Sequence, residues 1–400
     1  MVALPQEFIS RTRQLMGEER FDRYLAAFDE PAPVSIRLNP LNTLDTQHST
    51  LENVPWCPWG YYLPERPNFT FDPLLHAGCY YVQEAASMFL YTVLQQYMPQ
   101  HPIAMLDLCA APGGKSTLAR SILPEGSVLF CNEPVRSRAN ILLENIQKWG
   151  YANCYVTNNL PRDYRKSKMQ FDIILCDVPC SGEGMFRKDN ATIGEWSWRH
   201  VEQCQRLQRD IVSDAWHCLR DGGLLVYSTC TFNTLENEEN VRWIISEHDA
   251  RVLPVSTQPA WGITGSLLTG FQEPVYRFIP GITRGEGLFM CLIQKGNVSR
   301  EISHGSIKIP KTGINIMTPL PLHSDAPRVE LNYSQAIAYL RREAIILPET
   351  APLGIVEVCF NGYPLGMAKN VGTRANNLYP KEWKIKSTHV PQQEYVPIFR

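Results

Sequence analysis

From Met105 onward, short apolar runs alternate with longer segments that carry apolar residues at helical spacing. The runs predict strands at 105–109, 128–133, 154–158, 171–177, 223–229 and 287–294, with one or two more between 251 and 280. The segments between them predict helices near 115–122, 136–149, 201–219 and 235–247. This alternation is typical of a mostly parallel sheet covered by helices on both faces.

The flanking regions have a different pattern. Residues 5–28 predict one or two short helices, 34–39 a strand, and a helix opens at Gln83 and runs toward Met98. Residues 296–320 are polar and lack periodicity, which indicates a linker; after it come a predicted helix at 333–343, a strand at 354–360 and a basic, Asn/Gly-rich end. We therefore predict the following units: an N-terminal domain over 1–95, an α/β domain over 96–298, a linker over 299–320 and a C-terminal domain over 321–400.

Composition narrows the class of protein. The chain has 400 residues, of which 44% are hydrophobic, and a formal net charge of −2, so any nucleic-acid surface must be local. Twelve cysteines without a CxxC pair fit free thiols in a reducing compartment and predict no metal site. No basic leader precedes an apolar core, and no apolar run reaches membrane-spanning length, so we expect a cytoplasmic protein without a membrane partner.

A glycine-rich loop follows the first strand of the α/β region, in Leu106-Asp-Leu-Cys-Ala-Ala-Pro-Gly-Gly-Lys115-Ser-Thr. Backbone N–H groups at such a turn can hold a nucleoside or phosphate ligand. A P-loop that binds ATP is an alternative, but its pattern requires glycine where this chain has Cys109. Glu133 ends the next strand, where an acidic residue can bind ribose hydroxyls; Arg138, one turn later, is expected to pair with it.

Two cysteines stand just beyond the ends of apolar strands, in Asp177-Val-Pro-Cys180 and Ser228-Thr-Cys230. Ligands bind in the crevice at the carboxyl ends of such strands. A thiolate there can add to carbon 6 of cytosine, which turns carbon 5 into a nucleophile for a sulfonium methyl group. Asp177 could hold the base edge or the cofactor, and Lys115 could stabilise a thiolate. The pattern thus predicts methyl transfer to cytosine carbon 5.

These motifs resemble the Nop/Sun family of RNA cytosine-C5 methyltransferases, in particular its bacterial RsmF-like ribosomal members. The resemblance also covers Ser35-Ile-Arg37-Leu-Asn39, Gln83-Glu-Ala-Ala-Ser-Met88, Ser181-Gly-Glu-Gly-Met185 and Gly285-Glu-Gly-Leu-Phe. It implies a Rossmann-like class I S-adenosylmethionine methyltransferase domain, an N-terminal α+β extension and a small C-terminal PUA-like RNA-binding domain.

The resemblance also implies roles for individual residues. Cys230 would be the nucleophile and Cys180 would assist product release, while Asp177 and Lys115 match active-site polar positions. S-adenosylmethionine would be held by Glu133, Asp177 and the loop residues Cys109, Ala110, Ala111, Pro112, Gly113, Gly114 and Lys115. To this cofactor site we add Arg138 as a candidate of our own. The family usually has an acidic residue that contacts adenine where this chain has Leu160. Either Asn159 replaces that hydrogen bond, or adenine is held by apolar contact.

The basic C-terminal end mixes cations with aromatic residues, a composition that suits single-stranded RNA. We predict RNA contacts for Lys369, Arg374, Lys381 and Lys384, and a weaker one for Arg37 in the N-terminal strand. The target base must leave its stack to reach a strand-end crevice.

The sequence therefore predicts a monomeric, S-adenosylmethionine-dependent RNA methyltransferase that makes 5-methylcytidine, with 16S ribosomal RNA or the small ribosomal subunit as its partner. Transfer RNA is an alternative substrate. A P-loop-like nucleotide-binding protein and a non-catalytic RNA-binding module are alternatives from other classes.

Overall fold

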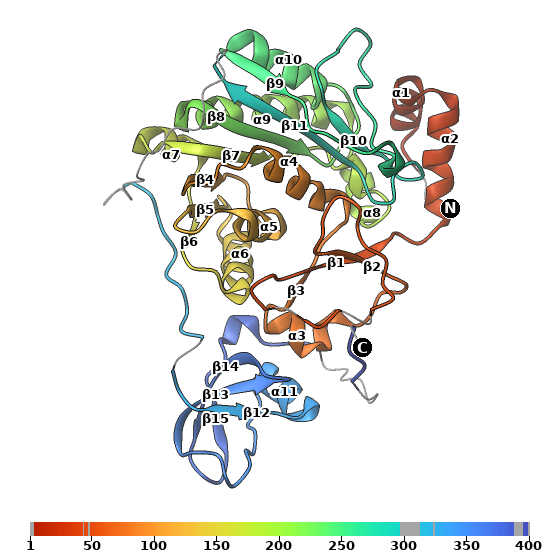
Figure 1. Cartoon of the computed structure of the whole chain (residues 1–400). Coiled ribbons are helices and arrows are strands. Elements are labelled where there is room, and N and C mark those ends of the chain that lie inside the picture. The colour runs from red at the N-terminus through yellow and green to blue at the C-terminus, as the bar shows by residue number, and fades with distance from the viewer. Residues whose placement is uncertain are drawn as a thin grey trace.

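The computed structural model describes residues 4–42, 44–46, 49–296, 313–322, 325–387 and 395–398. Its strands form three sheets: one from the N-terminal region of the sequence, a large one from the middle and one from the C-terminal region (Figure 1). Within these residues, no helix combines the length and apolar character that a membrane span requires.

The central sheet has eight described strands, in the order β10-β11-β8-β7-β4-β5-β6 with β9 paired to β11. The strands β4 to β8 run parallel to one another, whereas β9, β10 and β11 form an edge whose pairings, including that of β11 with β8, are antiparallel. Their bounds are β4 Ala104–Asp107, β5 Val128–Asn132, β6 Cys154–Thr157, β7 Phe171–Asp177, β8 Leu219–Thr229, β9 Ala250–Leu253, β10 Tyr276–Phe278 and β11 Leu288–Lys295. The predicted mostly parallel sheet is confirmed.

Helices cover both faces of this sheet because alternate strand residues point to opposite sides. In β7, Ile173 and Leu175 pack toward one hydrophobic cluster, whereas Ile174 and Cys176 pack toward another. The first cluster includes side chains of α4 Leu90–Tyr97, α5 Gly114–Ile122 and α6 Arg136–Trp149; the second includes those of α7 Pro161–Ser167, α9 Trp198–Cys218 and α10 Glu238–Glu247. The predicted Rossmann-like α/β architecture is thereby confirmed.

The N-terminal region combines two helices with an antiparallel sheet in the order β2-β1-β3. Its elements are α1 Gln6–Met16, α2 Glu18–Ala26, β1 Val34–Leu38, β2 Gly60–Leu63, α3 Pro73–His76 and β3 Tyr80–Val82. The prediction that a helix opens at Gln83 is wrong. A 3₁₀ turn at Ala86–Phe89 precedes α4, and the Glu84 carboxylate accepts the Ser87 N–H at 3.0 Å, so residues 83–85 stay outside the helix.

The C-terminal region is a four-stranded sheet with one helix, and it packs against the N-terminal sheet (Figure 1). Its elements are β12 Arg328–Glu330, α11 Tyr333–Leu340, β13 Gly354–Phe360, β14 Tyr363–Asn370 and β15 Ala375–Asn377. The basic end, for which the sequence analysis named no element, contains part of β14 and all of β15. The expected small C-terminal domain beside an N-terminal α+β extension is confirmed.

The predicted linker lies partly outside the described residues, over 299–312. Its remaining part runs along the edge of the central sheet, where Met317 N–H donates to the Val156 carbonyl at 2.8 Å and Ile316 forms a bridge with Thr157. This segment therefore extends the sheet beyond β6.

Candidate active site

The two cysteines predicted to act together lie in contact. Cys180 follows β7 and Cys230 follows β8, and because these strands are parallel neighbours both residues reach the same edge of the sheet. Their Sγ atoms are 3.2 Å apart, and the Cys230 N–H donates to Cys180 Sγ at 3.4 Å. The hydrogen bond with Cys230, together with burial, raises the pKa of the Cys180 thiol well above its usual value. Cys180 therefore stays protonated at neutral pH.

Lys115 and Asp177 form an ion pair beside these thiols. Lys115 Nζ donates to Asp177 Oδ2 at 2.8 Å, and Ser228 Oγ donates to Asp177 Oδ1 at 2.7 Å. Burial would lower the pKa of Lys115, but the charges of Asp177 and Cys230 act in the opposite direction and hold it above its usual value. The site thus keeps an ammonium within electrostatic range of the Cys230 sulfur.

The glycine-rich loop joins β4 to α5, as predicted. Gly113 has a φ of +112°, and a Cβ there would lie 3.1 Å from Leu142 of α6, so a side chain would be both strained and crowded. Below the loop, Ser116 Oγ donates to Asp107 Oδ2 at 2.6 Å, and burial raises the pKa of Asp107 to about 7.

A small pocket of about 170 Å³ lies between this loop and the N-terminal sheet, with Gln83, Asp107, Lys115 and Asp177 among its lining residues. Two buried atoms of these residues, Asp107 Oδ1 and Gln83 Nε2, have no hydrogen-bond partner within the described part of the chain. Unpaired buried polar atoms of this kind are rare without a ligand or water. The pocket therefore offers one acceptor and one donor to a bound polar group.

A larger cavity of about 790 Å³ opens on the other side of the loop. Both thiols line it, and so do Cys109, Ala111 and Asp177. Glu133 also lines the cavity. Its buried carboxylate accepts the Val135 N–H at 2.9 Å and lies 3.4 Å from the Arg138 guanidinium. Arg138 also donates to the Ala111 carbonyl at 3.1 Å, which ties the predicted cofactor residues to one another.

Four apolar residues that follow β5 and β6 in the chain, Pro134, Val135, Leu160 and Pro161, also line the cavity. Asn159 Nδ2 donates to the Asn315 carbonyl, and Asn159 Oδ1 accepts the Asn315 N–H. Both polar atoms of the Asn159 side chain thus already have a partner in the segment that extends the sheet.

Two buried carboxylates, which the sequence did not single out, connect the segments that follow the cysteines. Glu183, three residues after Cys180, accepts the N–H groups of Phe232 and Asn233 at 2.7 and 2.9 Å. Glu236, six residues after Cys230, accepts the Ser181 N–H at 3.0 Å. We call Glu183 and Glu236 the reciprocal carboxylates, because each segment supplies an acceptor for the backbone of the other.

Side chains complete this connection. Glu236 also accepts hydrogen bonds from Ser181 Oγ and, at 2.8 Å, from Asn233 Nδ2, and Ser181 Oγ lies 2.9 Å from Thr231 Oγ1. Burial, reinforced by the charge of Glu183, raises the pKa of Glu236 to about 7. The sequence signals were the Gly182-Glu-Gly184 turn and the Asn233-x-x-Glu236 spacing.

Gly184 lets the two segments approach this closely. Its N–H donates to the Cys230 carbonyl at 2.8 Å, and a Cβ at this position would lie 2.8 Å from that oxygen and 2.7 Å from the Gly287 Cα. Any side chain at Gly184 would push the Cys230 backbone out of place.

The predicted RNA contact of Arg37 is wrong. Its side chain is fully buried, donates to Gln83 Oε1 and Thr117 Oγ1 at 2.6 Å each, and lies over the Trp149 ring. It connects the N-terminal sheet to the first turn of α5. Arg37 is therefore a structural residue and cannot reach an RNA on the surface.

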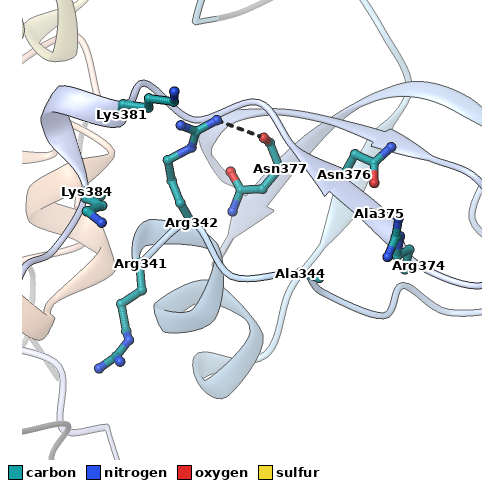
Figure 2. Close-up of a pocket in the computed structure, with 9 residues that line it drawn as sticks. All are labelled: Arg341, Arg342, Ala344, Arg374, Ala375, Asn376, Asn377, Lys381 and Lys384. Carbon is teal, nitrogen blue, oxygen red and sulfur yellow. Dashed lines mark hydrogen bonds between the residues drawn. The ribbon is translucent and has the colours of Figure 1, made fainter. Parts of the chain in front are cut away.

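Three of the four predicted C-terminal cations line one groove of about 630 Å³ (Figure 2). We call it the basic groove; its lining residues are Arg341, Arg342, Ala344, Arg374, Ala375, Asn376, Asn377, Lys381 and Lys384. None of these is acidic, although Arg341 pairs with Glu343 close by at 2.7 Å. Lys369 is exposed on β14 and is not one of the lining residues. Sequence reasoning missed Arg341 and Arg342, which follow α11.

No cluster of three His, Cys, Asp or Glu side chains that could hold a metal ion occurs within the described ranges.

Three family models match successive regions of the chain, and all three describe 16S rRNA methyltransferases or their domains. The family model for 16S rRNA methyltransferase RsmB/F matches residues 94–294, that for the N-terminal domain of 16S rRNA methyltransferase RsmF matches 4–85, and that for the methyltransferase RsmF PUA domain matches 326–385. The ribosomal RNA small subunit methyltransferase F of Cronobacter sakazakii is 30% identical over 93% of this chain and 82% of its own. Its Enterobacter counterpart is 28% identical over 95% of this chain and 96% of its own.

Solved structures show the same fold. A methyltransferase homolog protein from Pyrococcus horikoshii superposes with a TM-score of 0.62 at 27% identity, covering 74% of this chain and 96% of that one. NSun6 from Pyrococcus horikoshii, crystallised with SFG, has a TM-score of 0.61 at 22% identity and covers 74% of this chain and 99% of that one. The family models and the relative from Cronobacter sakazakii show that the chain is an RNA methyltransferase and belongs to the RsmB/F family of 16S rRNA methyltransferases.

Proposed function

We propose that this enzyme methylates carbon 5 of a cytosine in RNA through a covalent bond between Cys230 and carbon 6. The observation that carries the proposal is the pair of thiols with Sγ atoms 3.2 Å apart, next to the Lys115–Asp177 ion pair and inside the large cavity. Methylation of an amine or a hydroxyl group needs no thiol, whereas carbon 5 of a pyrimidine must first be activated.

The residues around the loop fit S-adenosylmethionine as the methyl donor, which when bound supplies an electrophilic methyl group on a sulfonium. Glu133 has its carboxylate at the end of β5, where it would accept the ribose hydroxyls. Leu160, Pro134 and Val135 would cover the adenine ring. The unpaired Asp107 Oδ1 and Gln83 Nε2 in the adjoining pocket would bind the ammonium and carboxylate of the amino-acid end.

In this mechanism, Cys230 attacks as a thiolate, and Lys115 stabilises its charge. Its sulfur bonds to carbon 6, and the electrons of the double bond between carbons 5 and 6 move to carbon 5. Carbon 5 then takes the methyl group while the bond between that methyl and the sulfonium sulfur breaks, and the electron pair stays on the donor's sulfur, which leaves as a thioether. Asp177 accepts a hydrogen bond from the exocyclic amine of the base, while its bonds to Lys115 and Ser228 fix its orientation.

Cys180 acts in the second half of the reaction. After the carbon 5 proton passes to solvent, the electron pair restores the ring double bond and the bond between carbon 6 and Cys230 Sγ breaks. A protonated Cys180 can donate a hydrogen bond to the departing Cys230 thiolate over the 3.2 Å separation. That bond stabilises the leaving group.

Release of the carbon 5 hydrogen tests this function directly. RNA labelled with tritium at carbon 5 of cytidine should release one tritium to water for each methyl group transferred from S-adenosylmethionine. Methyl transfer without tritium release would place the modification on another atom. RNA binding with neither signal would indicate a non-catalytic RNA-binding module. Small-subunit ribosomal RNA, named for the relatives, is the substrate to try first, and transfer RNA is the comparison.

We further propose that the basic groove binds phosphates of the substrate RNA. Replacing Arg374, Lys381 and Lys384 together with glutamine should weaken RNA binding by about 10-fold or more at low salt, because fewer counterions are released. A plot of log affinity against log salt should become less steep by about 2, because each phosphate neutralised on a single strand contributes about 0.7 to the slope.

Filter binding at several salt concentrations measures both the affinity and this slope. Lys386→Gln, an exposed neighbour outside the groove, is the matched control, and an unchanged slope in the triple variant would argue against the groove.

A further inference from the structure

We infer that Glu236 is a positioning residue that acts through Cys180 in the release of the methylated RNA. This inference rests on the proposed function, since it assumes the adduct on Cys230. It concerns a carboxylate that lies behind the thiols and touches neither of the reacting carbons.

Both carboxylate oxygens of Glu236 accept hydrogen bonds from Ser181, the residue after Cys180. One carboxylate oxygen accepts the Ser181 N–H at 3.0 Å, and the other accepts the Ser181 hydroxyl. Glu236 is itself completely buried and is held by Gln208 Nε2 at 2.7 Å. Because backbone and side chain of Ser181 are both fixed, the Cys180 main chain has little freedom to move.

The second thiol is fixed through the same network. Ser181 Oγ lies 2.9 Å from Thr231 Oγ1, and Thr231 directly follows Cys230. The residues next to the two cysteines are thus bonded to each other, and Glu236 orients the hydroxyl at their centre. This arrangement holds the two sulfur atoms at hydrogen-bond distance, which Cys180 needs in order to stabilise the departing thiolate.

Loss of the carboxylate should therefore slow one half of the reaction selectively. In Glu236→Gln, an amide N–H₂ replaces one acceptor and faces donors on Ser181, Asn233 or Gln208, so Ser181 is released. Attack by Cys230 remains possible, whereas release depends on Cys180. We expect the covalent RNA adduct to form and then to decay about 10- to 100-fold more slowly than in the wild type, as a displacement of about 1 Å would cause.

The experiment follows adduct formation and decay by denaturing gel after mixing enzyme, RNA and S-adenosylmethionine. Accumulation of adduct in Glu236→Gln supports the inference, because a merely structural defect would lower adduct formation and S-adenosylmethionine binding together. Ser181→Ala, which removes only the hydroxyl, should give a weaker accumulation and decides the matter if Glu236→Gln does not fold. Glu239→Gln, which alters a surface pair with Arg242, is the matched control and should behave as wild type.

Two outcomes would overturn the inference. The adduct could decay at the wild-type rate in both Glu236→Gln and Ser181→Ala, or neither of these two variants could form the adduct. A double variant, Cys180→Ala with Glu236→Gln, should decay no more slowly than Cys180→Ala alone, since both changes act on the same group. If Cys180→Ala itself forms no adduct, the proposed function fails; if it forms one and the other variants do not, only the role of Glu236 fails.

Discussion

Replacing Cys230 with alanine should reduce methyl transfer by about 10⁴-fold or more, to background, because the substitution removes the nucleophile that activates carbon 5. Binding of S-adenosylmethionine should persist, since the loop, Glu133 and Asp107 are untouched. The measurement is transfer of label from the methyl donor together with tritium release from carbon 5. Neither signal should rise above a no-enzyme control.

A matched control for this variant is Cys204→Ala. Cys204 is a buried thiol of α9 whose sulfur lies 3.6 Å from His200 Nε2, and it is not one of the residues that line the large cavity. Its replacement should leave methyl transfer close to wild type. Full turnover in Cys230→Ala combined with an inactive Cys180→Ala would reverse the roles of the two thiols.

The Cys180→Ala enzyme should instead accumulate a covalent complex with RNA. Cys230 can still attack and carbon 5 can still be methylated, but the departing thiolate loses its hydrogen-bond donor, so the bond between sulfur and carbon 6 persists. A band that resists denaturant on a gel, contains labelled RNA and disappears on ribonuclease treatment would demonstrate it. The band should be absent from the double variant Cys180→Ala/Cys230→Ala; its presence there would assign the bond to another side chain.

Periodicity predicted the central sheet well because its strands are buried on both faces and therefore read as continuous apolar runs. It failed where elements are short or polar. The helices α7 and α8 (Asn190–Glu195) have few apolar residues and were not predicted. The strand β14 contains Pro364 and Gly366 opposite a register shift at Val358, so its pattern does not alternate regularly.

Some residues of the candidate site could likewise be predicted from the sequence, and others could not. Cys180, Cys230, Lys115 and Asp177 could be predicted because strand ends and a glycine-rich loop are local features. Glu183 and Glu236 could not, since their partners lie about fifty residues away and an acidic residue in a loop looks the same whether it is buried or exposed. Arg37 was misassigned for a related reason: a strand with a polar residue suggests one exposed face, but β1 is covered on both. The exact domain boundaries remain predictions.

Asp107 and Glu236 are each buried, and burial raises the pKa of each to about 7. In the unfolded chain both would ionise near pH 4, so the native protein holds protons that unfolding sets free. The stabilisation from these protonated carboxyls is complete below about pH 4 and is lost as the pH rises through 7. It is worth up to roughly 4 kcal/mol for Asp107 and roughly 3 kcal/mol for Glu236. The heat of unfolding near pH 6 must accordingly include the ionisation enthalpy of whatever buffer takes up those protons.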